Sequence, residues 1–185
     1  MSIDTTKINL YTKRLLLRAL KFEDFDDFYE YNQMKDIAYN CGFESAESKE
    51  EAFEVMRNFI DDKNQLAIVL DQKLIGLIGF YDANLKDFNK LKDRKAIEFG
   101  FVLNRNYHRR GYMSEVLNCM INYIFTKTNY DIIEAGYFIG NEKSKNLQQK
   151  FNFKEIYRQK TKDRAKRERI AVISILKKED YLNLL

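Results

Sequence analysis

The chain has 185 residues, of which 45% are hydrophobic and 32% are charged, so it has the length of one compact domain and a composition that excludes a disordered chain. Its two cysteines and single histidine form no paired ligand motif, which argues against zinc sites, iron–sulfur clusters and disulfide scaffolds. The formal net charge is +4, and residues 154–169 hold eight Lys or Arg against three Asp or Glu. The positive excess is therefore local.

The sequence contains no sign of a targeting or membrane segment. No stretch approaches the roughly 18 uninterrupted apolar residues of a membrane span, and the first residues lack an apolar run of signal-peptide length. No internal repeat and no proline-rich or Gly-Ser linker divides the chain. We therefore expect a single domain over residues 1–185, in the cytoplasm and without a membrane partner.

The first part of the chain predicts one strand and two helices. Residues 10–20 are dense in leucine and predict a strand, after which aromatic residues recur at helical spacing over 22–29. Ser48 and Glu51 form a capping-box pair at the start of a second helix that extends to residue 60.

The remainder alternates strands with helices. Apolar runs over 65–70 and 73–82 predict a hairpin, and a repeat of three to four residues over 111–126 predicts a buried helix. The other predicted elements are strands over 94–104, 132–139, 153–157 and 167–176, and a short helix over 141–151. The order β-α-α-β-β-β-α-β-α-β-β predicts an α/β fold, a mixed sheet with helices on its faces.

The segment EFGFVLNRNYHRRGYMSE, residues 98–115, is the most informative. A strand ends, a loop with three arginines follows, and Gly111 opens the buried helix. A helix N-terminus offers unpaired N–H groups and a positive dipole end to a phosphate-like anion, and arginines reinforce it. A loop with solvated arginines explains the same residues equally well. The phosphate-loop motif GxxxxGK[ST] is absent, and Gly76 with Gly79 lies within a predicted strand, which argues against NTPase and dinucleotide folds.

Four segments in the same order resemble the Gcn5-related N-acetyltransferases (GNAT), in particular the branch that modifies the N-termini of ribosomal proteins. They are TKRLLLRAL, LIGLIGF, EFGFVLNRNYHRRGYMSE and NEKSKNLQQKFNF, and together they extend from Thr12 to Phe153. The resemblance implies the GNAT fold, a mixed and mostly antiparallel sheet of six to seven strands with helices on both faces. It also implies acetyl-CoA as cosubstrate and no metal.

The resemblance implies a role for each matching residue. Backbone groups of strand residues would pair with the pantetheine amides where two strands splay apart, and the loop and first helical turn would hold the pyrophosphate. Asn141 would bind the pantetheine arm, and Ser144 would lie near the thioester sulfur. The residues expected to bind acetyl-CoA are Phe101, Val102, Leu103, Arg109, Arg110, Gly111, Tyr112, Met113, Ser114, Asn141 and Ser144.

Glu98 is the candidate general base, with Ser144 as the second catalytic candidate. An alkyl amine is protonated at pH 7, so direct attack on the acetyl group needs a base or a water chain to one. Glu98 stands where the branch often has Glu, and strand alternation places it on the face opposite Ile97, Phe99 and Phe101. A carboxylate at a polar sheet face, or one in a structural ion pair, is the alternative interpretation.

Four residues depart from the family pattern. Arg109 replaces the first Gly of the loop, Met113 replaces a small residue, and Gln148 replaces a Tyr that acts as an acid in many relatives. Asn152 replaces a Gly, which is tolerable because Asn adopts left-handed backbone angles more readily than other residues.

We therefore expect an N-acetyltransferase that transfers acetyl from acetyl-CoA to a primary amine, either a peptide N-terminus or a small amine. A non-catalytic acyl-CoA-binding or interaction module is the alternative, motivated by the departures at the loop and at Gln148. We expect the basic segment over 154–169 to be a solvated hairpin turn, so nucleic acid is not the expected partner. The acceptor and a homodimer both stay open.

Overall fold

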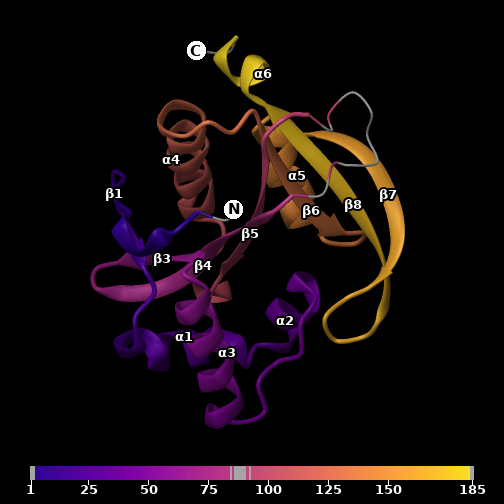
Figure 1. The fold of residues 1–185 in the computed structure, drawn as a ribbon. Helices are drawn as coiled ribbons and strands as arrows, with labels where there is room; N and C mark the ends of the chain where they lie inside the picture. Colours follow the sequence, from indigo (N-terminus) through magenta and orange to yellow (C-terminus); the bar gives the residue numbers. More distant parts are fainter. Residues whose placement is uncertain (1–2, 84, 86–90, 92, 184–185) are drawn as a thin grey trace.

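The computed structural model describes residues 3–83, 85, 91 and 93–183, and its centre is one twisted sheet (Figure 1). Over these residues the sheet has eight strands in the order β1-β2-β3-β4-β5-β6-β8-β7, and all neighbours are antiparallel except the parallel pair β5–β6. The strands are β1 (Asn9–Tyr11), β2 (Leu16–Ala19), β3 (Gln65–Leu70), β4 (Lys73–Asp82), β5 (Ala96–Leu103), β6 (Ile132–Phe138), β7 (Lys154–Lys162) and β8 (Glu168–Lys177).

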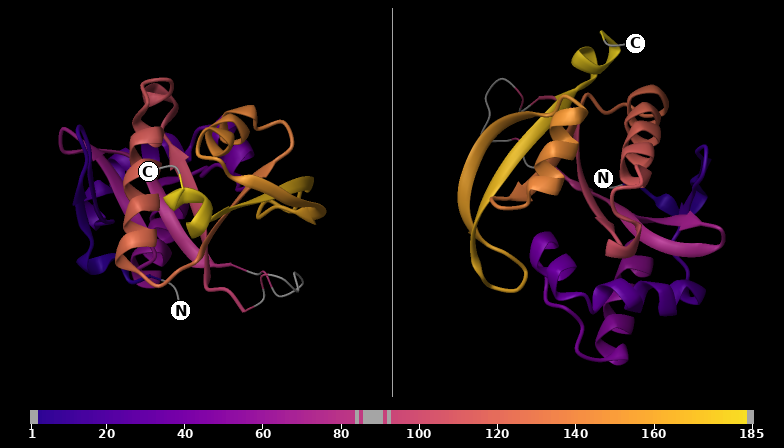
Figure 2. Two further views of the ribbon diagram at one scale, coloured as in Figure 1. Left: turned by 90° about the horizontal axis from the view of Figure 1, so that it is seen from above. Right: turned by 180° about the vertical axis from the view of Figure 1, so that it is seen from behind.

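Helices cover both faces of the sheet (Figure 2). They are α1 (Phe25–Asn32), α2 (Lys35–Cys41), α3 (Lys49–Asp62), α4 (Tyr112–Lys127), α5 (Glu142–Lys150) and α6 (Lys178–Leu182). Strand β3 explains the two layers, because Leu66 and Ile68 pack with α4 while the alternate residues Ala67 and Val69 pack with α1 and α3. The predicted α/β class, with a mostly antiparallel sheet between helices, is confirmed.

The prediction of one strand over residues 10–20 is wrong. The structure has two short antiparallel strands, β1 and β2, joined by a turn in which the Thr12 hydroxyl accepts the Leu15 N–H at 2.9 Å. This split makes eight strands in place of the six to seven expected. The short helices α2 and α6 were also missed, because α2 buries only Ile37 and Ala38 and α6 buries no side chain, so neither has the apolar repeat of a longer helix.

The predicted helix starts are confirmed. The Ser48 side chain caps α3 by accepting the Glu51 N–H at 3.2 Å, and Gly111 is the residue immediately before α4, at a left-handed φ of 80°. Asn152 has a φ of 59°, as expected for the residue that replaces Gly there. Glu98 lies on the face opposite Ile97 and Phe99, which both belong to the core around α4.

Strands β5 and β6 pair over only half of their length. Their parallel register runs from Ala96–Ile132 to Phe99–Ala135. Beyond that point β5 continues beside β4 as far as Leu103, and β6 continues beside β8 as far as Phe138. The two central strands therefore part from each other, and a gap opens in the middle of the sheet (Figure 1).

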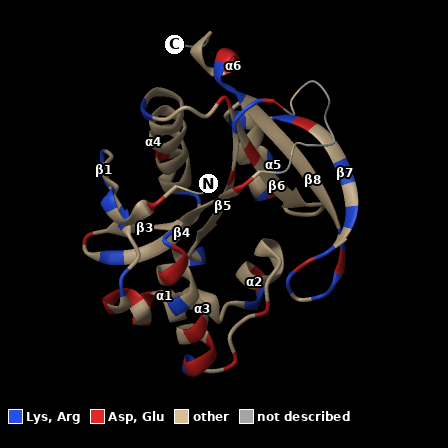
Figure 3. Cartoon of the chain, in the orientation of Figure 1, with Lys and Arg blue, Asp and Glu red and all other residues tan. Residues whose placement is uncertain are grey.

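Most of the basic residues of the β7–β8 hairpin are exposed, as expected from the sequence, but two arginines at its tip contact the segment around α2. Figure 3 shows Lys and Arg along β7 and around the hairpin tip. At the tip, the Arg167 and Arg169 side chains donate to the carbonyls of Phe43 and Tyr39, both at 3.0 Å. Both guanidinium groups also lie against the Tyr39 ring, at 5.0 and 4.1 Å from its centroid. The tip therefore holds the segment around α2.

Candidate active site

A cleft of about 750 Å³ lies where β5 and β6 part. Its walls come from the helices α1 to α3, from the parted strands, from the start of α5 and from the tip of the β7–β8 hairpin. Five of the residues predicted from the sequence line it, namely Glu98, Phe101, Val102, Asn141 and Ser144. The volume lies within the range of small-molecule and cofactor sites.

Glu98 is half-buried in the wall of this cleft. Burial raises the pKa of its carboxyl, and the positive charge of Arg164 at the hairpin tip lowers it by a smaller amount. Tyr81 stands opposite Glu98 on β4 and also lines the cleft, with its hydroxyl accepting the Gln65 amide at 2.8 Å. A carboxylate with a raised pKa beside a cleft has the property that a general base requires.

Glu134 is a second carboxyl beside Glu98 that the sequence analysis missed. It stands opposite Glu98 in the parallel register of β5 and β6, and only 5% of it is exposed. Its Oε2 atom is buried without a hydrogen-bond partner. Burial, and then the negative charge of Glu98, raise the pKa of Glu134 to about 7. The signal in the sequence that could have identified Glu134 is that it is the one charged residue of the apolar strand β6.

Ser144 and Gln148 lie one turn apart on α5, and both are buried. The Gln148 amide nitrogen donates to the Gly136 carbonyl at 3.3 Å and to the Ser144 hydroxyl oxygen at 3.2 Å. Because the carbonyl can only accept, this contact fixes which end of the Gln148 amide faces Ser144. The Ser144 hydroxyl receives that hydrogen bond, so its own hydrogen is free to be donated into the cleft.

Asn141 caps α5 and also contacts α2. Its side-chain oxygen accepts the Ser144 N–H at 3.2 Å, and its side-chain nitrogen donates to the Asn40 carbonyl at 3.2 Å. These bonds fix the side chain at the border of the cleft, between α5 and α2.

The loop before α4 has the backbone shape of a glycine-rich turn. Arg109 and Gly111 have φ angles of 61° and 80°, both in the left-handed region that glycine favours. Arg109 thus keeps the conformation although it replaces a glycine. Gly111 is the N-cap, so the N–H groups of the first helical turn, those of Tyr112, Met113 and Ser114, have no acceptor within the helix. The side chains of Tyr112 and Met113 are buried in the core.

The turn between β1 and β2 holds this helix start in place. Glu115, in the first turn of α4, accepts the Thr12 hydroxyl at 2.5 Å and the Arg14 N–H and Nε at 2.7 Å each. Burial raises the pKa of Glu115. The hydrogen bonds from Thr12 and Arg14 together lower this pKa by more than burial raises it, so the net shift is downward. Arg14 also donates to the Arg110 carbonyl at 3.0 Å and lies 4.3 Å from the centroid of the Tyr112 ring. The motif TKRLLLR therefore fixes the loop.

Lysines of α5 add positive charge near the same helix start, a feature the sequence analysis did not predict. Lys150 donates to the Ser114 hydroxyl at 3.3 Å, and Lys143 lies 3.2 Å from the His108 Nδ1. Because Lys143 can only donate, His108 Nε2 carries the hydrogen and donates to the Leu103 carbonyl at 2.9 Å. Burial lowers the pKa of His108, which fits this neutral form. The Leu103 carbonyl, one of the backbone groups predicted to bind acetyl-CoA, therefore already accepts a hydrogen bond from His108.

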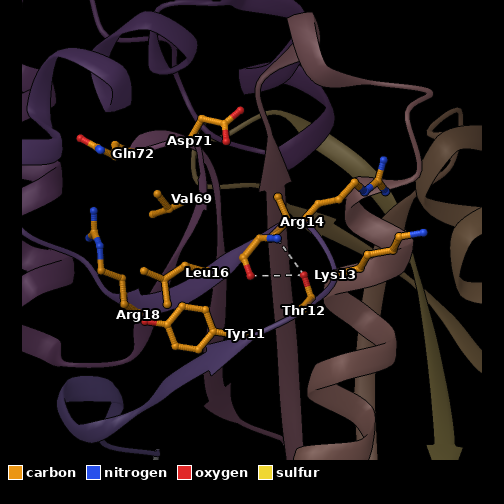
Figure 4. Close-up of a pocket in the computed structure, with 10 residues that line it drawn as sticks. Tyr11, Thr12, Lys13, Arg14, Leu16, Arg18, Val69, Asp71 and Gln72 are labelled. Carbon is orange, nitrogen blue, oxygen red and sulfur yellow. Dashed lines mark hydrogen bonds between the residues drawn. The ribbon is translucent and has the colours of Figure 1, made fainter.

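A second, smaller hollow of about 450 Å³ adjoins the β1–β2 turn (Figure 4). Its lining includes Tyr11, Arg18 and Gln72, and Figure 4 shows the Thr12 hydroxyl bonded to the backbone of the turn. None of its residues was predicted to bind a ligand or to act in catalysis. We therefore place the candidate active site in the larger cleft.

Within the described residues, no group of three or more His, Cys, Asp or Glu side chains is arranged to hold a metal ion. Over the same part of the chain, no helix has the length and apolar character needed to cross a membrane.

The chain is similar to proteins of one family in sequence and in structure. The sequence profile described as "Acetyltransferase (GNAT) domain" matches residues 14–154. The uncharacterized N-acetyltransferase YnaD of Bacillus subtilis (strain 168) is 34% identical over 134 residues, which cover 69% of this chain and 72% of that protein.

Two crystal structures of acetyltransferases have the same fold. Spermidine N-acetyltransferase from Vibrio cholerae, in complex with CoA and spermine, gives a TM-score of 0.72 at 22% identity and covers 92% of this chain and 99% of its own. The ribosomal L7/L12 alpha-N-protein acetyltransferase RimL gives a TM-score of 0.74 at 12% identity, with 92% and 94% covered. The family resemblance predicted from the four sequence segments is confirmed, and the chain belongs to the GNAT family of acetyltransferase enzymes.

Proposed function

We propose that this enzyme transfers acetyl from acetyl-CoA to a primary amine in the cleft between β5 and β6. The observation that carries the proposal is the parting of these strands, with Glu98 on β5 and Ser144 on α5 lining the same cleft. The whole chain acts as one N-acetyltransferase domain in this proposal.

The described residues are suited to hold an acyl-CoA. Beyond Phe99, the edge of β5 that faces the cleft has lost its partner strand, which leaves a polypeptide edge for the amides of a pantetheine arm. The free N–H groups of Tyr112, Met113 and Ser114, with the charges of Arg109 and Arg110, suit a pyrophosphate. The lysines of α5, Lys143 and Lys150, add to this positive end.

Bound acetyl-CoA supplies the thioester that the acceptor amine attacks. Glu98 takes the proton of the acceptor's ammonium group, which makes the nitrogen a nucleophile. Ser144 donates its hydroxyl hydrogen towards the departing sulfur, and Gln148 keeps that hydroxyl oriented by donating to its oxygen. Gln148 therefore supports the donor at the position where relatives use a Tyr acid.

The cleft favours an acceptor with an apolar group beside one amine. Several aromatic side chains line the wall, among them Phe43, Phe59 and Phe101. The charged residues of the lining are mixed, since it includes Glu44 and Glu98 as well as Lys162 and Arg164, and Asp163 is paired with Arg167. A polyamine carries several positive charges and needs an acidic cleft, so we propose a monoamine or a peptide N-terminus with an apolar side chain.

Acetyl-CoA-dependent thiol release tests the proposal, with 2-phenylethylamine, spermidine and peptides starting in Ser, Met or Phe as acceptors. We expect release with the aromatic amine or an apolar N-terminus, and much slower release after Glu98→Gln with unchanged affinity for acetyl-CoA. Binding of acetyl-CoA without thiol release for any acceptor would favour a non-catalytic module. Absence of binding would refute the cofactor assignment.

A further inference from the structure

Glu134, a buried carboxyl with no assigned role, lies beside the proposed base Glu98 on the neighbouring strand. Glu98 and Glu134 are register partners on adjacent parallel strands, so their side chains leave the sheet on the same face with backbones about 5 Å apart. The two residues form the next-to-last register pair before β5 and β6 part, and Glu98 lines the cleft. Two ionised carboxylates this close and this buried repel each other strongly.

Among the residues that the structure describes, Glu134 has no positively charged hydrogen-bond or ion-pair partner. On β8, Ile175 stands opposite it, and along its own strand the same face carries Ile132 and Gly136. Its Oε2 atom is buried and has no hydrogen-bond partner, although a buried carboxylate ordinarily has one. A neutral, protonated carboxyl fits these surroundings better than a carboxylate.

Among the described residues, the other ionisable groups around the pair come from the sheet, the hairpin tip and the helices. On β4 the neighbour is Tyr81, on β8 it is Lys177, opposite Ile132, and on β7 it is Lys154, opposite Ile175. The hairpin tip contributes Lys162, Asp163 and Arg164 to the cleft, and the helical side contributes Tyr31, Cys41 and Glu44. Of these, Arg164 acts on Glu98, by lowering its pKa less than burial raises it, and the charge of Glu98 in turn acts on Glu134.

We propose that Glu98 and Glu134 act as one acid–base pair, in which Glu134 is a positioning residue that controls the pH at which Glu98 can accept a proton from the amine. The inference rests on the proposed function, because it needs Glu98 as the base. Below neutral pH the pair holds one proton and one negative charge. Above it both carboxylates are charged, and their repulsion makes Glu98 a stronger base than a lone glutamate.

The proton balance of the reaction is then complete. One N–H bond of the acceptor's ammonium group breaks and an O–H bond forms on the pair, after which the neutral nitrogen attacks the acetyl carbon. A C–N bond forms and the C–S bond breaks. The Ser144 hydroxyl gives its hydrogen to the thiolate and regains one from the nitrogen, so the second proton of the nitrogen is transferred to the sulfur. The pair returns its proton to water through the cleft, so each turnover releases one proton.

The first test needs no acceptor. In the full chain with ¹³C-labelled glutamate carboxyl groups, NMR titration should show one carboxyl with an apparent pKa near 7. That resonance should vanish in Glu134→Gln, and the carboxyl of Glu98 should then titrate about one pH unit lower than in the wild-type pair. If no glutamate titrates above pH 6 in the wild type, the proposal is overturned.

The second test uses the pH profile of kcat/KM with the fastest acceptor of the panel. In Glu134→Gln, the rising part of the kcat/KM profile should move to lower pH by about one pH unit. The reaction should be several-fold slower above pH 8, with an unchanged KM for acetyl-CoA. Glu155→Gln, which removes a carboxylate paired with Arg158 on β7, is the matched control and should leave the rising part in place.

The outcomes separate this inference from the proposed function. A slow Glu98→Gln enzyme together with an unshifted Glu134→Gln profile would overturn the pair and leave the proposed function standing. Wild-type thiol release in Glu98→Gln would remove Glu98 as the base, and with it the pair, while acetyl transfer itself would stand. A change in unfolding temperature alone, with an unshifted profile, would make Glu134 purely structural.

Discussion

Replacing Asp163 with Ala should release the tip of the β7–β8 hairpin from α2 and destabilise the protein. The Asp163 side chain has no exposed surface, and it accepts the Arg167 N–H at 3.0 Å and the Arg167 Nε at 2.8 Å. Arg169, whose side chain is 8% exposed, lies 3.5 Å from the same carboxylate. The substitution therefore leaves a buried guanidinium without its counter-charge.

The size of the effect follows from these exposures. Removing one member of a buried ion pair costs about 3–5 kcal/mol, and the lower value applies because Arg167 is 30% exposed and can be rehydrated. For a domain of this length, about 3 kcal/mol corresponds to a Tm lower by about 6–12 °C. Differential scanning calorimetry measures the shift directly, and urea unfolding gives the free energy of unfolding independently.

A matched substitution separates burial from charge. Asp26→Asn breaks an ion pair with Lys49 in which the Asp26 side chain is 88% exposed, and it should change the free energy of unfolding by less than about 0.5 kcal/mol. A Tm for Asp163→Ala within about 2 °C of the wild type would refute the reasoning, because the buried network would then contribute no more than the exposed pair.

Three further predictions concern the site and its pH dependence. Gly111→Val should raise the KM for acetyl-CoA at least about tenfold in steady-state assays, because a branched side chain is strained at a φ of 80°. The control Lys63→Val, at a φ of 53° after α3, should leave that KM unchanged. Ser144→Ala should lower kcat about 10- to 100-fold with little change in KM, and Ser144→Thr should restore part of it, since the hydroxyl donor is what the proposal requires; equal rates for both variants would contradict it. Glu134→Gln should stabilise the protein more at pH 8 than at pH 5, by about 2 kcal/mol, as measured by urea unfolding. A carboxyl whose folded pKa of about 7 exceeds its unfolded value stabilises at low pH and loses that contribution as the pH rises through 7; an equal effect at both pH values would contradict the raised pKa.

Local signals made much of the fold predictable. The Ser48 cap and the start of α4 at Gly111 were found because each depends on a few neighbouring residues. The position of Glu98 on the polar face of β5 followed from strand alternation alone. The collinear family motifs then supplied the expectation that two strands part where the pantetheine arm binds, which periodicity by itself does not indicate.

The features that were missed depend on contacts between distant parts of the chain. Glu134 is significant only because it stands opposite Glu98, and parallel register between strands separated by a helix cannot be read from the sequence. The contacts of Arg167 and Arg169 at the hairpin tip were missed because their partner, Tyr39, lies in a short helix with a weak apolar pattern. Arg14 likewise acquires its role from Glu115, about a hundred residues later.

The bond from Arg14 to the Arg110 carbonyl also determines where the next amide points. A trans peptide unit is planar, with its oxygen and its hydrogen directed to opposite sides. Since the oxygen of the 110–111 unit is held by the guanidinium at 3.0 Å, the hydrogen on the Gly111 nitrogen is directed away from that side chain. The orientation of this peptide plane therefore depends on a turn near the N-terminus, and grafting residues 98–127 alone into another scaffold should not reproduce it.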